Sequence, residues 1–161
     1  TAVQTEYSLW TRNPEIAVLQ ACQELGAAFV AFSPVARGFL CGELDLQSFD
    51  AKDIRKGMPR FTPENYAANF KLFAPYLSLA QEVGCSPAQL ALAWLLHKDT
   101  HIVPIPGTTS VSHLQDDVGA ANVKLSPEFI AKLDALINEK TVQGSRYSAQ
   151  SNSEVDTENF A

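Results

Sequence analysis

Cysteine is scarce in this chain of 161 residues: Cys22, Cys41 and Cys85 are its only three, and no two of them are closely spaced. An odd number of widely separated cysteines indicates neither a disulfide framework nor a zinc site. We therefore expect no metal centre. The same pattern is typical of a protein of the reducing cytoplasm.

Positive charge is also in short supply. The chain has 12 Lys and Arg against 18 Asp and Glu, a formal net charge of −6, and its basic residues are spread thinly. A nucleic-acid surface requires clustered Lys and Arg to neutralise phosphates. The sequence therefore excludes nucleic acid as a partner, and any anion must be bound locally.

Three further signals are missing. No apolar run reaches the roughly 18 residues that a membrane-spanning helix needs, and no signal peptide precedes the first expected strand, so we expect no membrane association. No Gly-x-Gly-x-x-Gly turn follows a strand, which removes the usual dinucleotide-binding fingerprint. The chain begins at Thr1 without an initiator Met, which predicts that an upstream segment is missing.

The most informative stretch that is present spans residues 102–118. A short apolar run, Ile102 to Ile105, stops at Pro106-Gly107, and the hydroxyl residues after it open an amphipathic helix. The N-terminus of a helix offers unpaired N–H groups and the positive end of a dipole to an anion. Residues 28–38 repeat this pattern, so the sequence predicts one phosphate-rich ligand held between two strand ends.

Strands and helices alternate along the chain. We expect strands at residues 3–9, 28–32 and 101–105, a polar surface loop at 42–62, and a polar tail at 141–161. The expected helices run from an Asn13 cap with Pro14 to Gly26, from Pro63 to about Val83, from the Ser86 cap to His97, from Val111 to Ala120, and from Ser126 to about Lys140.

Short strand-helix units indicate an α/β fold with parallel strands and right-handed crossovers, either an open doubly wound sheet or part of a barrel. The site-like residues follow the carboxyl ends of all three strands, which is where (β/α)₈ barrels build their sites. Three strands cannot close an eight-stranded barrel. We therefore expect a partial TIM barrel.

The residues also resemble the C-terminal half of an aldo-keto reductase. The resemblance implies strands six to eight of a (β/α)₈ barrel within residues 1–140, a C-terminal tail at 141–161, and NADPH-dependent reduction of a carbonyl group. The matching segments follow the order of the family and are Val3 to Leu9, Val30 to Leu40, Pro59 to Phe61 with Glu64 and Asn65, Ser86 to Leu96, Ile102 to Thr108, and Gly144 to Tyr147.

The resemblance implies a set of cofactor-binding residues. Gln4 corresponds to the side chain that binds the nicotinamide carboxamide, a task that needs a donor and an acceptor on one group, and Phe32 to the aromatic ring that stacks on the nicotinamide. The implied pyrophosphate loop consists of Ser33, Pro34, Val35, Ala36, Arg37 and Gly38. The implied adenosine segment consists of Gly107, Thr108, Thr109, Ser110, His113, Asp116 and Asp117.

This sequence departs from the family in two ways. Residues 107–117 contain no Arg or Lys for a 2′-phosphate, so NADP is the expected cofactor with NAD as the alternative. The family's catalytic Tyr, Lys, Asp and His motifs are absent, so we assign no catalytic residue and expect the chain alone to be inactive. Tyr7 matches a framework position instead. Trp10 is either a wall of the substrate pocket or a packing residue.

Several other residues have structural interpretations. We interpret Glu6 as a buried, hydrogen-bonded carboxylate and Trp94 as a core residue. His97 and His101 bracket a turn without a third metal ligand, and His113 either binds phosphate or lies exposed on its helix. Cys41 is reactive only if its thiolate is stabilised.

Two functions follow from the sequence. In the first, the chain is the cofactor-binding half of an NAD(P)H-dependent oxidoreductase that reduces an aldehyde or ketone, with the missing N-terminal half of the barrel as its partner. In the second, it is a non-catalytic half-barrel that binds a nucleotide or a protein. Unpaired strand edges and a bare apolar face favour the first.

Overall fold

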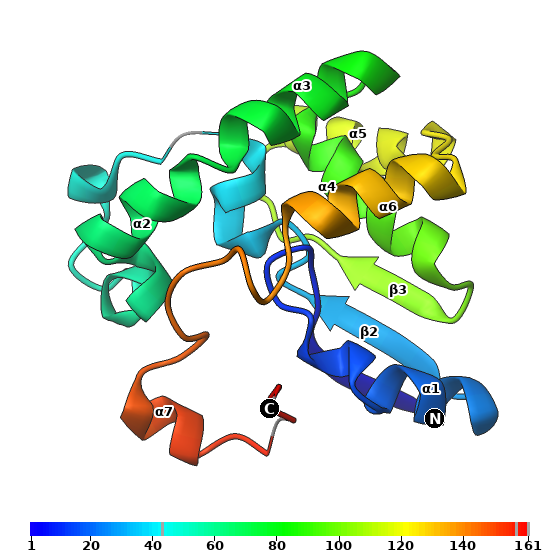
Figure 1. The fold of residues 1–161 in the computed structure, drawn as a ribbon, viewed down its shortest axis with the longest axis horizontal. Helices are drawn as coiled ribbons and strands as arrows, with labels where there is room; N and C mark the ends of the chain where they lie inside the picture. Colours follow the sequence, from blue (N-terminus) through cyan, green and yellow to red (C-terminus); the bar gives the residue numbers. More distant parts are fainter. Residues whose placement is uncertain (43, 157, 161) are drawn as a thin grey trace.

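The computed structural model of the protein describes residues 1–42, 44–156 and 158–160. At its centre lies a parallel sheet with the strand order β1 (Ala2–Glu6), β2 (Ala28–Phe32) and β3 (Ile102–Ile105) (Figure 1). The register places Gln4 beside Val30 and Val30 beside Val103. The predicted strands are therefore confirmed, although β1 ends at Glu6, before Leu9.

One face of this sheet is covered and the other is open. On the covered face Phe29 and Ala31 of β2 are fully buried, and Ile102 of β3 is 3% exposed. On the opposite face Val103 and Ile105 are 47% and 42% exposed. Parallel sheets normally bury both faces. A three-stranded sheet with one bare apolar face is therefore consistent with part of a barrel.

The helix α4 (Pro87–Lys98) supplies most of the covering layer. Ser86 accepts a hydrogen bond from the Gln89 N–H, and the Gln89 side chain accepts one from the Ser86 N–H, which forms a complete capping box. Six consecutive residues, Leu90 to Leu95, are buried, and Trp94 is completely enclosed. The interpretation of Trp94 as a core residue is thus confirmed.

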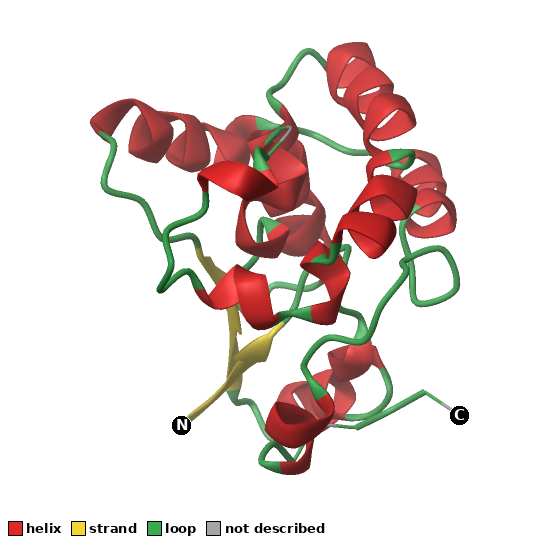
Figure 2. Ribbon diagram, turned by 90° about the vertical axis from the view of Figure 1, so that its left-hand side faces the viewer, coloured by secondary structure: helices red, strands yellow, loops and turns green. Residues whose placement is uncertain are grey.

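In Figure 1, α3, α4 and α6 lie above the sheet, and α1 lies beside the N-terminal end of β2. Figure 2 shows that most helices lie on one side of the sheet. Their bounds are α1 (Val18–Glu24), α2 (Pro63–Phe70), α3 (Phe73–Val83), α5 (Val111–Gly119), α6 (Pro127–Leu136) and α7 (Ala149–Ser153). Gly84 directly follows α3 and Gly26 lies two residues after the end of α1; their φ angles of 76° and 63° are positive, as expected of helix-ending glycines.

Three predicted helices differ from the observed ones. The single helix expected from Pro63 to Val83 is two helices, because Pro75 has no N–H to donate to the carbonyl of Lys71 and its ring crowds that carbonyl. The last helix ends at Leu136 rather than near Lys140, because the Asn138 amide caps the carbonyls of Asp134 and Ala135.

The first helix also begins later than predicted. Asn13 does not cap it: Asn13–Glu15 forms a separate 3₁₀ helix, and α1 begins only at Val18. The physical reason lies in Glu15, whose carboxylate is held by the Tyr7 hydroxyl at 2.6 Å and by the Arg12 guanidinium. These contacts hold residues 13–15 in the 3₁₀ conformation, so the α-helix begins after them.

The expected surface loop and tail are more ordered than predicted. The region after β2 contains the 3₁₀ helices Ala36–Cys41, Leu46–Ser48, Ile54–Gly57 and Pro59–Phe61, while a further 3₁₀ turn, Ala120–Asn122, follows α5. Phe49 and Phe61 bury their rings in an aromatic cluster. In the tail, Val142 is buried and Arg146 contacts Glu6 of β1. In the part of the chain that the structure describes, no helix has the length and apolarity to cross a membrane.

Candidate functional site

The two predicted anion-binding segments meet at one cavity. This cavity of about 230 Å³ is lined by Val35 from the loop after β2 and by Gly107 and Thr108 from the loop after β3. His113, Asp116 and Asp117 of α5 complete that side of the wall. The structure thus brings together residues that lie more than 70 positions apart in the sequence, as Val35 and Thr108 do. We call this space the interloop cavity.

The loop after β2 has an unusual backbone. Ser33, Ala36 and Arg37 have φ angles of 51°, 53° and 56°, and Gly38 follows at 93°. The left-handed conformation costs a non-glycine residue about 1–3 kcal/mol and concentrates at ligand-binding sites. Three such residues within five positions indicate a loop whose conformation is imposed by its surroundings.

Hydrogen bonds fix the shape of this loop. The Ala36 N–H donates to the Ser33 carbonyl at 2.9 Å, and the Gly38 N–H donates to the Val35 carbonyl at 3.1 Å. Arg55 donates to the Arg37 carbonyl from outside the loop at 3.1 Å. The N–H groups of Ala36 and Gly38 therefore serve the loop itself rather than pointing freely at a ligand.

The side chain of Arg37 forms an ion pair with Glu6 of β1, at 3.0 Å between Nη2 and Oε2. Glu6 is 4% exposed and also accepts hydrogen bonds from Thr11 at 3.0 Å and from Arg146 at 3.1 Å. The interpretation of Glu6 as a buried, hydrogen-bonded carboxylate is confirmed. The positive charge expected of Arg37 is thus largely neutralised by Glu6.

The hydroxyl groups before α5 form its cap. The Ser110 hydroxyl accepts from the His113 N–H at 3.4 Å, and the Thr108 hydroxyl accepts from the Ser110 N–H at 3.1 Å. Thr109 is exposed beside them. The strand-to-helix turn expected at residues 105–111 is therefore present, with its hydroxyl groups arranged around the helix start.

The interloop cavity is acidic. Burial, and then the neighbouring Asp116, raise the pKa of Asp117. Cys41 is an exposed residue whose thiol faces the same cavity, and partial desolvation there together with the charges of Asp117 and Asp116 raises its pKa to about 11. Cys41 is therefore not an activated thiol. Asp116 itself accepts a hydrogen bond from the Ser86 hydroxyl at 2.5 Å, which ties α5 to the start of α4.

Gln4 and Phe32 lie on the open side of the sheet. Gln4 is exposed and lines a second cavity of about 390 Å³ together with Asp156 and Glu158 of the tail. Phe32 pairs with Glu6 on one side and Ile105 on the other, and the Arg146 guanidinium lies 5.8 Å from its ring centre. Pro34, the remaining member of the predicted loop, is buried.

Trp10 is packed inside the aromatic cluster. It is 3% exposed, stacks on Phe39 at a centroid distance of 4.2 Å, and meets Phe61 edge-on at 5.5 Å. Its indole N–H has no hydrogen-bond partner among the described residues. These contacts favour a packing role, and the predicted role in substrate binding remains a prediction.

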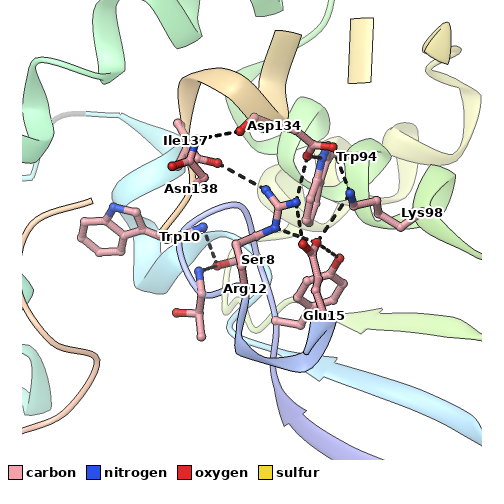
Figure 3. A network of polar contacts seen from close by, with 11 residues as sticks. Ser8, Trp10, Arg12, Glu15, Trp94, Lys98, Asp134, Ile137 and Asn138 are labelled. Carbon is pink, nitrogen blue, oxygen red and sulfur yellow. Dashed lines mark hydrogen bonds and ion pairs between the residues drawn. The ribbon is translucent and has the colours of Figure 1, made fainter. Parts of the chain in front are cut away.

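A network of partly buried charges that the sequence did not reveal joins the segment after β1 to α4 and α6 (Figure 3). Arg12 pairs with Glu15 at 2.6 Å and with Asp134 at 3.1 Å, and Lys98 pairs with Asp134 at 3.0 Å. The Trp94 indole also donates to Asp134, at 2.9 Å. Two cations and two carboxylates balance each other, which indicates a structural clamp.

Tyr7 belongs to this clamp. Its hydroxyl donates to Glu15, its ring is completely buried, and burial followed by the Glu15 charge raises its pKa well above the ordinary value. A hydroxyl with a raised pKa whose proton is held by a carboxylate is a poor acid near neutral pH. These contacts support the framework interpretation of Tyr7.

Neither histidine near β3 is arranged for metal binding. His97 places its Nδ1 2.8 Å from the Ala93 carbonyl, and its Nε2 accepts from the Leu125 N–H. His101 places its Nδ1 3.0 Å from Asp99. Within the described ranges there is no group of three or more His, Cys, Asp or Glu side chains that fits a metal ion.

Sequence reasoning missed several arginines that contact the site. Arg55 holds the loop after β2, while Arg60 and Arg146 lie beside Glu6 in a small cavity that Arg37 and Trp10 also line. Arg60 and Arg146 fall within two of the segments that carry the family resemblance, Pro59 to Phe61 and Gly144 to Tyr147. Their joint position depends on contacts between distant segments, which no local pattern reveals.

Comparison with known proteins gives a consistent result. The family model described as the aldo/keto reductase family matches residues 1–138. A solved structure of the thermostable aldo-keto reductase Tm1743 in complex with the inhibitor epalrestat is 28% identical, with a TM-score of 0.57 over 83% of this chain. The glycerol dehydrogenase AKR11B4 from Gluconobacter oxydans is 23% identical, with a TM-score of 0.75 over 88% of this chain.

The match covers only part of each of these structures. This chain spans 38% of the Tm1743 chain and 43% of the AKR11B4 chain. Aldo-keto reductase neighbours imply a (β/α)₈ barrel, and the three parallel strands found here are consistent with part of one. Since the family model covers well over half of the sequence, the chain belongs to the aldo/keto reductase family.

Proposed function

We propose that this chain is the cofactor-binding half of an NAD(P)H-dependent oxidoreductase that reduces aldehydes or ketones. The observation that carries the proposal is the interloop cavity, where Val35 meets Gly107, Thr108 and the start of α5. Family membership supports an oxidoreductase in general terms. The carbonyl substrate and the cofactor are the more specific parts of the proposal.

The residues present fit a dinucleotide with one qualification. The N-terminus of α5 suits a phosphate group, the strained loop after β2 lines the same cavity through Val35, and the exposed amide of Gln4 suits a carboxamide. The two carboxylates of Asp116 and Asp117, however, disfavour the additional 2′-phosphate that distinguishes NADP from NAD. We therefore propose that this half-barrel binds NADH at least as well as NADPH.

The chemistry divides between cofactor and protein. When bound, the dinucleotide supplies a hydride to the carbonyl carbon. In this chain Gln4 would hold the carboxamide, the ring of Phe32 would hold the nicotinamide, and the two loops would hold the phosphates. The proton for the carbonyl oxygen comes from an acid outside this chain, since Tyr7 is committed to Glu15. We propose that the first half of the barrel provides that acid.

Titration of NADH and NADPH into the chain, followed by nicotinamide fluorescence, tests the proposed cofactor site. Thr108→Glu places a negative charge on the cavity wall and should weaken binding of both dinucleotides by about tenfold. Gln115→Glu adds the same charge to an exposed position of α5 that does not line the cavity, and should leave binding unchanged. Equal effects of the two substitutions would place the dinucleotide elsewhere.

The alternative function is a non-catalytic half-barrel that binds a nucleotide or a protein. A stripe of exposed apolar residues on α5 favours it: Val111, Leu114 and Val118 are 72%, 53% and 66% exposed. The open face of the sheet, in contrast, favours the missing half of a barrel. Among the described residues β1 and β3 pair only with β2. We propose that the N-terminal half of a barrel covers these surfaces.

Reconstitution distinguishes the two functions. The chain alone should not oxidise NADH or NADPH with a panel of aldehydes and ketones, because general acid catalysis contributes roughly 10²–10⁴ in rate. Addition of an N-terminal half from a family member should restore turnover. Turnover by the isolated chain that Tyr7→Phe abolishes would show that Tyr7 is the acid. Binding of the N-terminal half without turnover would favour the alternative.

A further inference from the structure

Three arginines surround a single carboxylate at the end of β1. Arg37 and Arg146 both donate to Oε2 of Glu6, and Arg60 lines the same small cavity. These three arginines come from the loop after β2, the 3₁₀ helix Pro59–Phe61 and the tail. In a chain with a net charge of −6, this is a local excess of positive charge.

Arg60 contributes one of these positive charges, and its hydrogen-bond acceptors are uncharged. Its guanidinium donates to the carbonyl of Trp10 at 2.7 Å, to the Thr11 hydroxyl at 2.8 Å and to the carbonyl of Gly144 at 3.2 Å, which are all neutral acceptors. No carboxylate of a described residue forms an ion pair with it. Burial lowers the pKa of Arg60 to about 10; the charges of Arg146 and Arg37 also lower it, whereas Glu6 raises it.

A buried donor beside Arg60 has no hydrogen-bond partner among the described residues. The Trp10 indole N–H is enclosed and has no partner among the described residues, and Trp10 lines the small cavity together with Arg60. Buried charges and donors without partners are costly, and an ordered water, an ion or a ligand commonly completes them. The small cavity has a volume of about 10 Å³, which admits no more than a water molecule, so the anion site that the charge of Arg60 indicates lies in a second cavity that Arg60 also lines.

The position of the cluster indicates which anion it takes. Glu6 lies two residues beyond Gln4 on the same face of β1, about 6.5 Å along the strand. Arg60 and Arg146 also line a cavity of about 510 Å³, a size that fits a small molecule. Glu139 and Lys140 contribute one charge of each sign to this cavity. The loop after β3, which lines the interloop cavity, does not contribute to it.

We propose that Arg60 and Arg146 bind the carboxylate of a carbonyl substrate, so that the substrates of the complete enzyme are oxo acids. The guanidinium fork matches the two oxygens of a carboxylate. This assignment rests on the proposed function, since it presumes a carbonyl group near Gln4. A carboxylate and a phosphate share the chemistry that arginine recognises, so the test separates a substrate carboxylate from the pyrophosphate of the cofactor.

The probes are succinate and its neutral diamide, succinamide, titrated into the full chain by isothermal titration calorimetry. Succinate should bind saturably and succinamide should not. Arg60→Gln should weaken succinate binding at least about tenfold. Lys132→Gln removes a positive charge from an exposed pair with Glu82 and should leave binding unchanged.

A measurement on the unmodified protein covers the case in which Arg60→Gln fails to fold. Succinate should protect Arg60 and Arg146 from modification by phenylglyoxal, as mapped by mass spectrometry, whereas succinamide should not. Equal binding of succinamide, absence of saturable succinate binding, or absence of protection would each overturn the proposal.

Competition with inorganic pyrophosphate identifies the source of the anion. If pyrophosphate displaces succinate and Arg60→Gln weakens NADH as much as succinate, the cluster belongs to the cofactor and the proposal is wrong. Binding of NADH without binding of succinate would overturn this proposal alone. Binding of succinate that depends on Arg60, without binding of NADH, would retain the anion site and overturn the dinucleotide site.

Discussion

Replacement of Glu6 by Gln is the sharpest test of how the site is held together. Glu6 is 4% exposed and connects β1 to the loop after β2 through Arg37 and to the tail through Arg146. Gln keeps the size of the side chain and one oxygen that accepts from Thr11. It removes the single negative charge that faces three guanidinium groups.

The structure sets the expected magnitude. Removal of one partner from a buried ion pair costs about 3–5 kcal/mol, because the remaining charge stays buried and unpaired. The side chains of Arg37 and Arg146 are 16% and 10% exposed, so water partly compensates them. We therefore expect Glu6→Gln to lower the free energy of unfolding by about 3 kcal/mol, near the lower end of that range.

Urea unfolding followed by circular dichroism measures this change, and comparison of m values shows whether the folded state has loosened. Glu82→Gln is the matched control, because the Glu82–Lys132 pair is 55% and 56% exposed and should contribute less than about 1 kcal/mol. If Glu6→Gln costs no more than this control, the three arginines are solvated and the cluster does not hold the site together.

Three other predictions follow from individual contacts. Asp117→Asn should strengthen binding of NADPH relative to NADH, because it removes a carboxylate from the acidic interloop cavity; unchanged relative affinity in fluorescence titrations would contradict the electrostatic argument. The Arg55 hydrogen bonds lower the pKa of Asp53 from 3.8 to about 2, so the ionised carboxylate stabilises the fold above about pH 4 and this contribution is lost as the pH falls towards 2. Asp53→Asn should remove this part of the pH dependence of the urea midpoint. Identical pH profiles of the variant and the parent protein would refute the prediction. Gly144→Ala should destabilise the fold more than Gly26→Ala. Both glycines have positive φ, so each substitution costs about 1–2 kcal/mol of backbone strain, but only at Gly144 would the new Cβ meet neighbours, with Asn65 at 2.8 Å and the Pro59 backbone at 3.1 Å. Equal losses of stability in thermal unfolding would show that this crowding is relieved at no cost.

Local sequence signals determined the elements of this fold. Ser86 and Ser126 each accept a hydrogen bond from the N–H three residues later, as expected where a helix begins. Ser110, which was expected to bind an anion, caps its helix in the same way. Gly26 and Gly84 adopt the left-handed conformation after helices. Such features depend on a few neighbouring residues, so the sequence alone indicates three parallel strands, their helices and the resemblance to half of a barrel.

Only the tertiary structure decided which charged side chains from distant elements contact each other. Glu6 and Arg146 are 140 residues apart, and Arg12 and Ile137 are 125 apart, yet each pair is joined by a hydrogen bond. Sequence periodicity records which face of an element is apolar, but not which distant charge will meet it. For this reason the sequence could predict a site at Gln4, Phe32 and the two loops. Only the tertiary structure shows that Glu6 neutralises Arg37, that Trp10 is packed among aromatic rings, and that further arginines lie around Glu6.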